Sequence, residues 1–225
     1  MVVAVNEYYP IELFHWSGMK DEHLYMVKDI LSIHPEYINK INGGYENCLF
    51  IAAKTGNLNM VKYFIEETEI NINYKTPDGN VLFVAIENSK LDVVDYLLSC
   101  PKVKINDLNS FGETIYHSIA KIGNSDLMEK VMSLNPIGIS LKSVDFDKRN
   151  CLFNLIDNYV KHKDYWCFEL IQQELTKEDL LTKDENNQNI LDFIIYKQLE
   201  IKKRFPLLKE PFEPLIHILK SRVNY

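Results

Sequence analysis

The sequence has 225 residues, of which 46% are apolar, so it can bury one sizeable core or two smaller ones. Its 25 Lys and Arg against 32 Asp and Glu give a formal net charge of −7, which argues against a nucleic-acid partner because phosphate binding needs cationic side chains. No signal-peptide pattern opens the chain, and no stretch approaches the roughly 20 apolar residues of a membrane helix, so we expect a cytoplasmic protein without membrane insertion.

The four cysteines, at positions 48, 100, 151 and 167, are widely separated. They form no C-x-x-C pair and no Cys/His cluster with the spacing of a zinc site. No G-x-x-x-x-G-K-S/T or G-x-G-x-x-G loop is present to hold a phosphate. We therefore expect a reducing compartment, no metal and no cofactor.

Residues 10–41 contain two short apolar segments. The first is residues 13–16 (LFHW), and the second has apolar residues at helical spacing between Leu24 and Leu31. This pattern predicts a degenerate N-terminal pair of helices.

Residues 42–134 repeat themselves with a period near 33 residues. Residues 47–53 (NCLFIAA) match residues 80–86 (NVLFVAI), and a third copy begins at residue 112 after a step of 34. Each copy has two apolar stripes at helical spacing, separated by a turn at Gly56, Ser89 or Gly123. The pattern predicts three regular helix-turn-helix units.

Turn-forming residues separate successive units, at residues 43–45 (GGY), 77–79 (PDG) and 111–112 (FG). We expect their glycines to supply the positive φ that tight turns require. Helices this short are marginal alone in water, so each pair must bury its apolar stripe against its neighbours. The expected fold is an all-α solenoid.

Residues 135–225 continue the pattern less regularly. Residues 150–153 (NCLF) repeat residues 47–50, and Cys167, Leu170 and Ile171 then supply a second stripe after an insertion. Residues 189–195 (NILDFII) begin a last copy, whose second helix would follow a proline-containing connection. We expect a single domain over residues 1–225, with five to six units and two divergent repeats plus a C-terminal cap in residues 135–225.

These residues resemble the ankyrin repeat, whose signature is similar to G-x-T-P-L-H-x-A-A-x-x-G followed by an apolar stripe. The third copy keeps the motif residues in register: Gly112, Thr114, His117, Ala120 and Gly123. The motif proline is absent from every copy, and phenylalanine replaces the histidine at positions 50, 83 and 153. The resemblance extends over residues 10–225 and is strongest from 42 to 134.

The resemblance implies a concave surface that binds a protein partner through hairpin tips and the exposed ends of inner helices. Aromatic and arginine side chains dominate interface energies, so Tyr45, Phe111, Phe146 and Arg149 are the expected anchors. The alternative for Phe111 and Phe146 is that they cover a neighbouring repeat. The full expected set is Tyr45, Glu46, Lys54, Tyr74, Asp78, Glu87, Asn88, Ser110, Phe111, Glu113, Lys121, Ile122, Phe146, Arg149 and Asp157.

For the residues whose side chains could take part in catalysis, we favour structural roles. Cys48 and Cys151 lie in the repeat motif as small packed residues, and His117 stands at the structural histidine of the family. Glu66, Glu67, Glu69, Asp184 and Glu185 are expected to be solvated at helix ends or loops. Trp16, Trp166 and Phe168 are expected to fill the core.

Three functions remain open from the sequence. The first is a non-catalytic protein-interaction module, expected to be monomeric, although Tyr8, Tyr9, Phe14 and Trp16 would allow weak self-association. The second is a host-directed effector or host-range factor of a pathogen that uses the same surface, in the host cytoplasm. The third is a small enzyme or enzyme adaptor with a site in residues 135–225, depending on His162, Asp164 or Cys167.

Overall fold

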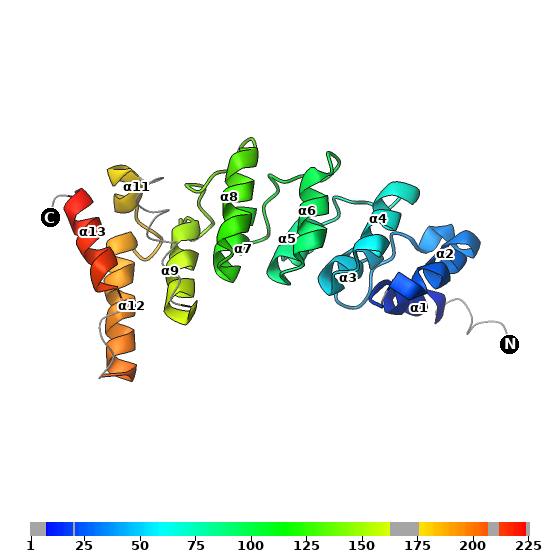
Figure 1. Ribbon diagram of the computed structural model, residues 1–225, viewed down its shortest axis with the longest axis horizontal. Helices are drawn as coiled ribbons and strands as arrows, with labels where there is room; N and C mark the ends of the chain where they lie inside the picture. The colour runs from blue at the N-terminus through cyan, green and yellow to red at the C-terminus, as the bar shows by residue number, and fades with distance from the viewer. Residues whose placement is uncertain (1–7, 20, 163–175, 207–211, 224–225) are drawn as a thin grey trace. The chain divides into compact units, whose positions relative to one another are not determined.

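The computed structural model describes residues 8–19, 21–162, 176–206 and 212–223 (Figure 1). In these residues the regular structure consists of twelve α-helices and two short 3-10 helices, with isolated β-bridges at Thr76–Gly79 and Val144–Asn150. The expected all-α repeat fold is confirmed. The chain forms two compact units, Met1–Ser110 and Phe111–Tyr225, which we describe separately.

The first unit contains three successive pairs of antiparallel helices. Its elements are α1 (Tyr8–Ser17), η1 (Asp21–His23), α2 (Leu24–Ile33), η2 (Pro35–Tyr37), α3 (Cys48–Thr55), α4 (Leu58–Glu67), α5 (Val81–Glu87) and α6 (Leu91–Ser99). The inner helix α3 packs against its partner α4 and also against α1 and α5 of the neighbouring pairs. The pairs therefore stack as a repeat array, with a core between them.

The second unit contains α7 (Ile115–Ile122), α8 (Ser125–Leu134), α9 (Cys151–His162), α11 (Lys177–Leu181), α12 (Ile190–Arg204) and α13 (Glu213–Val223). Helix α9 packs between α7 and α12, and α13 packs on α11 and α12. With 15 residues, α12 is about twice as long as α3 or α7, which the repeat pattern does not predict. The expected stripe at Cys167, Leu170 and Ile171 lies outside the described residues.

Asparagine side chains begin most of the repeat helices. The Oδ1 atom of Asn47 accepts a hydrogen bond from Phe50 N, at 3.0 Å, and that of Asn80 accepts one from Leu82 N, also at 3.0 Å. Each bond satisfies a backbone donor that has no partner within its helix. Asn57, Asn124 and Asn189 cap α4, α8 and α12 in the same way.

Where phenylalanine stands in place of the motif histidine, its ring packs in the core instead of forming hydrogen bonds. Phe50 and Phe83 are fully buried at the first turns of α3 and α5, and Phe153 is buried at the start of α9. A ring fully removed from water contributes about 2–3 kcal/mol of transfer free energy. The polar network of the motif is therefore replaced by apolar packing in three of the copies.

The turn between the two helices of a pair lies where the sequence predicts it, and it contains a residue in the left-handed conformation. Gly56 and Gly123 have φ values of 85° and 69°, and Ser89 occupies the equivalent position with φ 54°. A side chain in this region is strained, whereas glycine is not. The turn between α5 and α6 is therefore less favourable than its two counterparts.

We expect Ser89→Gly to raise the free energy of unfolding of the Met1–Ser110 unit by about 0.5–1 kcal/mol, through relief of this strain. Urea denaturation followed by circular dichroism measures the change. Ser110→Gly is the control, because Ser110 is exposed and has no positive φ. A loss of stability in Ser89→Gly would mean that backbone strain at this turn is negligible.

In the loops between helix pairs, the residues with positive φ are not all the glycines that the sequence predicts. In the first loop the left-handed residue is Tyr45 (φ 62°), so the prediction that Gly43 or Gly44 supplies the positive φ is wrong. Gly79 and Gly112 do supply it in the next two loops, and Lys148 and Asn187 take its place in the last two. Three of the five loops therefore hold a strained residue where a glycine would be relaxed.

Candidate partner-binding site

Carboxylate and amide side chains build the hairpin tips. Asp145 Oδ1 accepts from Arg149 N at 2.9 Å, and Asp184 Oδ1 accepts from Asn186 N and Gln188 N, each at 2.9 Å. In the first unit, Asn42 Oδ1 accepts hydrogen bonds from Gly44 N and Glu46 N. These bonds replace the backbone partners that a turn lacks, and they fix the direction of the residues at each tip.

Successive tips of the second unit are joined through their backbones. Phe146 N donates to Phe111 O and Glu185 N donates to Asp147 O, each at 2.9 Å. The two phenylalanines are consequently neighbours on ordered loops. Phe111 is 60% exposed and Phe146 is 72% exposed.

The ring of Phe146 also covers part of the preceding repeat. A Cβ atom placed on Gly112 would lie 2.6 Å from Phe146 Cδ1, so the ring rests against this glycine. The alternative that Phe146 folds back on a neighbour is therefore correct for one side of its ring. The rest of the side chain remains in contact with solvent.

Arg149 is not the available anchor that the sequence suggested. Its Nε and one terminal nitrogen each lie 2.9 Å from Asp184 Oδ2, and its guanidinium lies over the rings of Phe153 and Phe193, at 5.5 and 5.6 Å from their centroids. An arginine held by two hydrogen bonds and two rings joins two repeats.

The expectation that Asp184 is solvated is wrong, because its side chain is fully buried. Burial alone would raise the pKa of this carboxyl. The hydrogen bonds from Gln188 N, Arg149 and Asn186 outweigh burial and hold the pKa below its usual value. Glu66, Glu67, Glu69 and Glu185 are exposed, as expected.

Glu113 was expected to be exposed, but it is 6% exposed and its Oε2 atom lies 2.6 Å from Lys121 Nζ. The first unit repeats this arrangement, because Glu46 Oε1 lies 2.8 Å from Lys54 Nζ. In both cases the acid precedes the inner helix and the lysine is in its last turn, eight residues later. Lys54 and Lys121 remain exposed.

The tip of the first loop presents Tyr45, which is 63% exposed. Its carbonyl accepts a hydrogen bond from Tyr74 Oη at 3.0 Å, and the Tyr74 ring makes an edge contact with Phe50. Asp78 and Ser110 are exposed, and Ser110 N donates to Pro77 O at 2.9 Å. Tyr74 is half-buried and therefore supports the tip rather than projecting from it.

The other expected contact residues differ in their surroundings. Glu87 and Asn88 are exposed at the end of α5, and Ile122 is half-buried at the end of α7. Asp157 on α9 lies 2.8 Å from Lys197 Nζ on α12. Thus some of the predicted residues are accessible, whereas Glu113, Arg149 and Asp157 are engaged by other side chains.

His117 has a structural role. Its Nδ1 atom accepts from Thr114 N at 3.1 Å, and Nε2 lies 2.9 Å from Arg149 O. Burial lowers the pKa of this imidazole, although its contact with Arg149 O opposes that shift. The neutral ring with the proton on Nε2 satisfies both partners.

Neither Cys48 nor Cys151 offers an activated thiol. Cys48 and Cys151 are fully buried, and burial raises the pKa of each to about 12. Their thiols donate to Ile38 O and Leu141 O. A thiol in this state is an inert packing group.

The enzyme alternative rested on His162, Asp164 and Cys167. Asp164 and Cys167 lie outside the described residues, as do Trp166 and Phe168, and His162 ends α9. Trp16 is half-buried and stacks on His23 at 5.1 Å. Among the residues that the structure describes, no three His, Cys, Asp or Glu side chains are placed to hold a metal ion.

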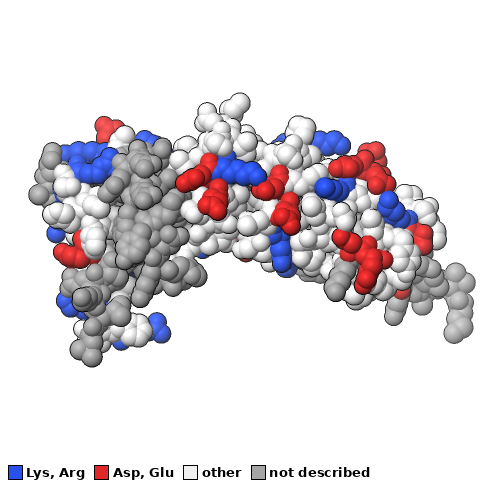
Figure 2. Space-filling view, in the orientation of Figure 1, with Lys and Arg blue, Asp and Glu red and all other residues white. Residues whose placement is uncertain are grey.

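Figure 2 shows acidic and basic side chains interspersed on the visible face, so the described residues of that face form no broad basic patch.

Among the described residues, no helix is both long and apolar enough to cross a membrane.

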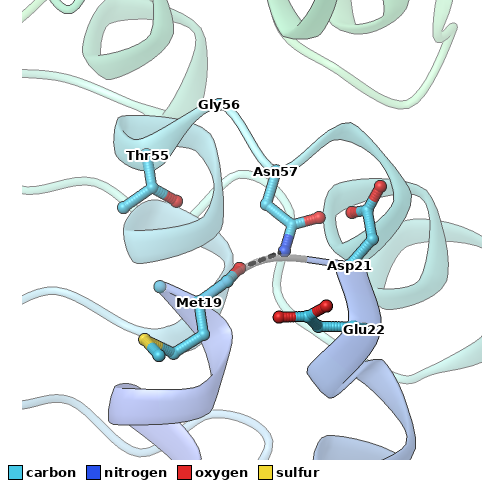
Figure 3. A pocket seen from close by; sticks show the side chains of 7 residues that line it. Met19, Asp21, Glu22, Thr55, Gly56 and Asn57 are labelled. Atoms are coloured by element: carbon cyan, nitrogen blue, oxygen red, sulfur yellow. Dashed lines mark hydrogen bonds between the residues drawn. The ribbon is translucent and has the colours of Figure 1, made fainter.

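An open crevice of about 460 Å³ lies beside the turn between α3 and α4 (Figure 3). Asp21 and Glu22 line one side, and Thr55 and Gly56 line the other. Asn57 Nδ2 spans it to reach Met19 O at 2.6 Å, while its Oδ1 caps α4. The crevice is therefore a seam between two repeats that Asn57 joins.

The sequence interpretation missed the tip residues that accept several backbone hydrogen bonds. Asn42, Asp145 and Asp184 each stand five residues before the asparagine that precedes an inner helix: Asn47, Asn150 and Asn189. This spacing could have identified Asp184 as a turn residue. Its pairing with Arg149 needs the stacking of two repeats and has no signal in the sequence.

Stacked pairs of short antiparallel helices joined by hairpin-like tips define a helical repeat protein. Residues 14–109 match the family model for ankyrin repeats, in three copies. Residues 14–109 are therefore ankyrin repeats, as the sequence predicted.

The fold is also shared with a solved structure. A chain in the complex of the predatory endopeptidase Bd0816 of Bdellovibrio bacteriovorus with the immunity protein Bd3460 is 21% identical, with a TM-score of 0.65. The alignment covers 84% of this chain and 92% of the other. No curated protein sequence gives a significant match.

Proposed function

We propose that this chain is a non-catalytic module that binds a partner protein through its hairpin tips, with Phe111 and Phe146 as the principal anchors. Ankyrin repeats form a class of protein-interaction modules, and the solved structure of similar fold holds two proteins in complex. From that structure we carry over only the kind of ligand, a protein.

The observation that carries the proposal is the exposure of two neighbouring phenylalanines on loops that are hydrogen-bonded to one another. Aromatic side chains held in place lose little entropy on binding and bury a large apolar area. Lys121 and Lys148 are exposed on the same unit, each paired with an acid, and they add polar groups to its surface.

In the first unit Tyr45 extends the proposal. It is an exposed aromatic residue at a positive φ, where glycine would be relaxed. Strain that persists at an exposed position favours a functional role for the side chain. Asp78, Glu87, Asn88 and Lys54 are the exposed polar residues that we assign to the binding surface of this unit. A reducing compartment fits the free thiols of Cys48 and Cys151.

The test is affinity capture from a lysate of the source cell, comparing wild type with the double variant Phe111→Ala, Phe146→Ala. We expect the partner that the wild type retains to bind the variant at least about tenfold more weakly, because each anchor is worth about 1–2 kcal/mol or more. Arg149 is left unchanged because removing it would strand the buried Asp184.

Phe205→Ala is the matched control, since Phe205 is 54% exposed in the same unit and follows the C-terminal end of α12, the end opposite the loop that contains Asp184. Its capture should equal that of the wild type. Equal capture by all three proteins, with circular dichroism showing that all are folded, would rule out the tip phenylalanines as anchors.

A further inference from the structure

The charge of the chain is concentrated in its first unit. Residues 1–110 contain nine lysines and no arginine against fifteen acids, a net charge of −6, whereas residues 111–225 carry 16 basic and 17 acidic residues, a net charge of −1. Figure 2 shows clusters of acidic side chains on the visible face of the first unit. A unit with this excess attracts cationic segments over distances of about 8 Å in physiological salt.

An apolar groove opens on this unit between the outer helices α2 and α4. Its volume is about 310 Å³. Leu31 and Ile38 form buried parts of its wall, and Pro35 and the half-buried Tyr63 ring add further apolar surface. This groove lies on the outer helices, whereas the tips and inner helices form the surface proposed above.

One end of the groove is negative. Glu67 and Glu69 line it, both exposed, and they stand at the C-terminal end of α4, where the helix dipole adds negative potential. Lys102 Nζ lies 3.4 Å from Ile65 O in the last turn of the same helix. A lysine from the next repeat is thus already drawn to this helix end.

The groove also holds an alkylammonium group of the chain itself. Lys28 Nζ lies 4.7 Å from the centroid of the Tyr63 ring and 3.2 Å from Glu67 Oε2. The ring face and the carboxylate together form a receptor for a cation on an aliphatic stem. Lys28 and Glu67 remain about half exposed, so the same environment is accessible from solvent.

We propose that this groove is a second docking site, which takes a basic amphipathic segment of a partner protein. An apolar side chain of the segment fills the space beside Leu31 and Ile38, and an arginine or lysine next to it reaches Glu67 and Glu69. The site is independent of the tip phenylalanines, because it lies on other helices of the other unit.

The probe is a synthetic amphipathic peptide with the repeating sequence Leu-Ala-Ala-Arg, which places leucine and arginine on one face of a helix. The peptide is titrated into the whole chain, and binding is measured by changes in the amide chemical shifts of the protein. We expect saturable shifts around Ser32, Ile38, Tyr63 and Thr68. The counterparts with Leu-Ala-Ala-Glu or Ala-Ala-Ala-Arg repeats should bind more weakly.

Variants that alter the charge of the groove should change its affinity for the peptide in opposite directions, which a merely structural role would not produce. Glu69→Gln should weaken binding of the arginine peptide about three- to fivefold, and Lys28→Gln should strengthen it by a similar factor. Each variant changes the charge at the groove by one unit, which changes the binding free energy by about 1 kcal/mol or less. Ser32→Trp, which fills the groove from an exposed position, should remove binding.

Asp92→Asn is the matched control, an exposed acid of α6 in the same unit and outside the groove. It should leave affinity unchanged. If Asp92→Asn weakens binding as much as Glu69→Gln, the peptide senses only the net charge of the unit and the docking site is refuted. Unchanged binding in Ser32→Trp, or shifts located elsewhere, would refute it as well.

Discussion

Asp184→Ala should lower the stability of the Phe111–Tyr225 unit by about 3 kcal/mol, because it leaves Arg149 without its buried partner. Asp184 Oδ2 binds two nitrogens of Arg149 at 2.9 Å, and Oδ1 accepts from Asn186 N and Gln188 N. Removing the carboxylate therefore breaks both an inter-repeat bridge and the turn itself. Urea denaturation followed by circular dichroism measures the loss.

A neighbouring pair between the same two tips is the control. Lys148 Nζ lies 2.9 Å from Glu185 Oε1, but both side chains are more than half exposed. Glu185→Ala should cost no more than about 0.5 kcal/mol, since exposed ion pairs contribute little. Equal losses in the two variants would show that burial of Asp184 has no energetic consequence.

The lowered pKa of Asp184 also predicts a dependence of stability on pH. A carboxyl whose pKa is lower in the folded state contributes stability that is present above its unfolded pKa, about 3.9, and is lost as the pH falls through the folded value. The unit should therefore lose stability below about pH 4. In Asp184→Asn this part of the acid loss should be absent, and urea midpoints at pH 3 and pH 6 measure the difference.

The second large effect is expected for Gly79→Ala. Gly79 has φ 117°, and a Cβ atom there would lie 2.5 Å from Cγ of the fully buried Phe83 ring. The alanine would be strained and would also push a core ring that has no space to move. We expect a loss of about 2–4 kcal/mol in the Met1–Ser110 unit, from backbone strain and overpacking together.

Gly43→Ala separates these effects from the general cost of changing a loop glycine. A Cβ atom on Gly43 would meet nothing within 4 Å, and its φ is not positive. Its free energy of unfolding should change by less than about 0.5 kcal/mol. A Gly79→Ala variant as stable as Gly43→Ala would mean that the loop moves freely without disturbing Phe83.

The candidate site was predictable only in part. The sequence placed Tyr45, Phe111 and Phe146 at loop tips, and all three are exposed. It also placed Glu113 and Arg149 there as accessible residues, and the structure corrects both. Whether a charged side chain at a tip faces solvent depends on a partner from another turn or repeat, and sequence spacing does not reveal that partner.

Two other local features also depend on the tertiary structure. Asn158 of α9 is buried, and its Nδ2 donates to Ala120 O and Lys121 O at the end of α7. The positive φ in the first loop belongs to Tyr45 rather than to its adjacent glycines. Asp145, Asp184 and Asn42 had a detectable signal, because their spacing from the next helix is constant.

The sequence by itself determined the helix pairs of residues 42–134, the turns within those pairs and the resemblance to the ankyrin repeat. Those features depend on local chemistry: apolar residues at helical spacing, an asparagine before an inner helix, and Gly56 or Gly123 after one. The tertiary structure decided which side chains remain available, because stacking joins Arg149 to Asp184, buries Glu113 beside Lys121 and forms the groove at Tyr63. These contacts join residues from different turns and repeats, so their energies depend on packing that no local pattern encodes.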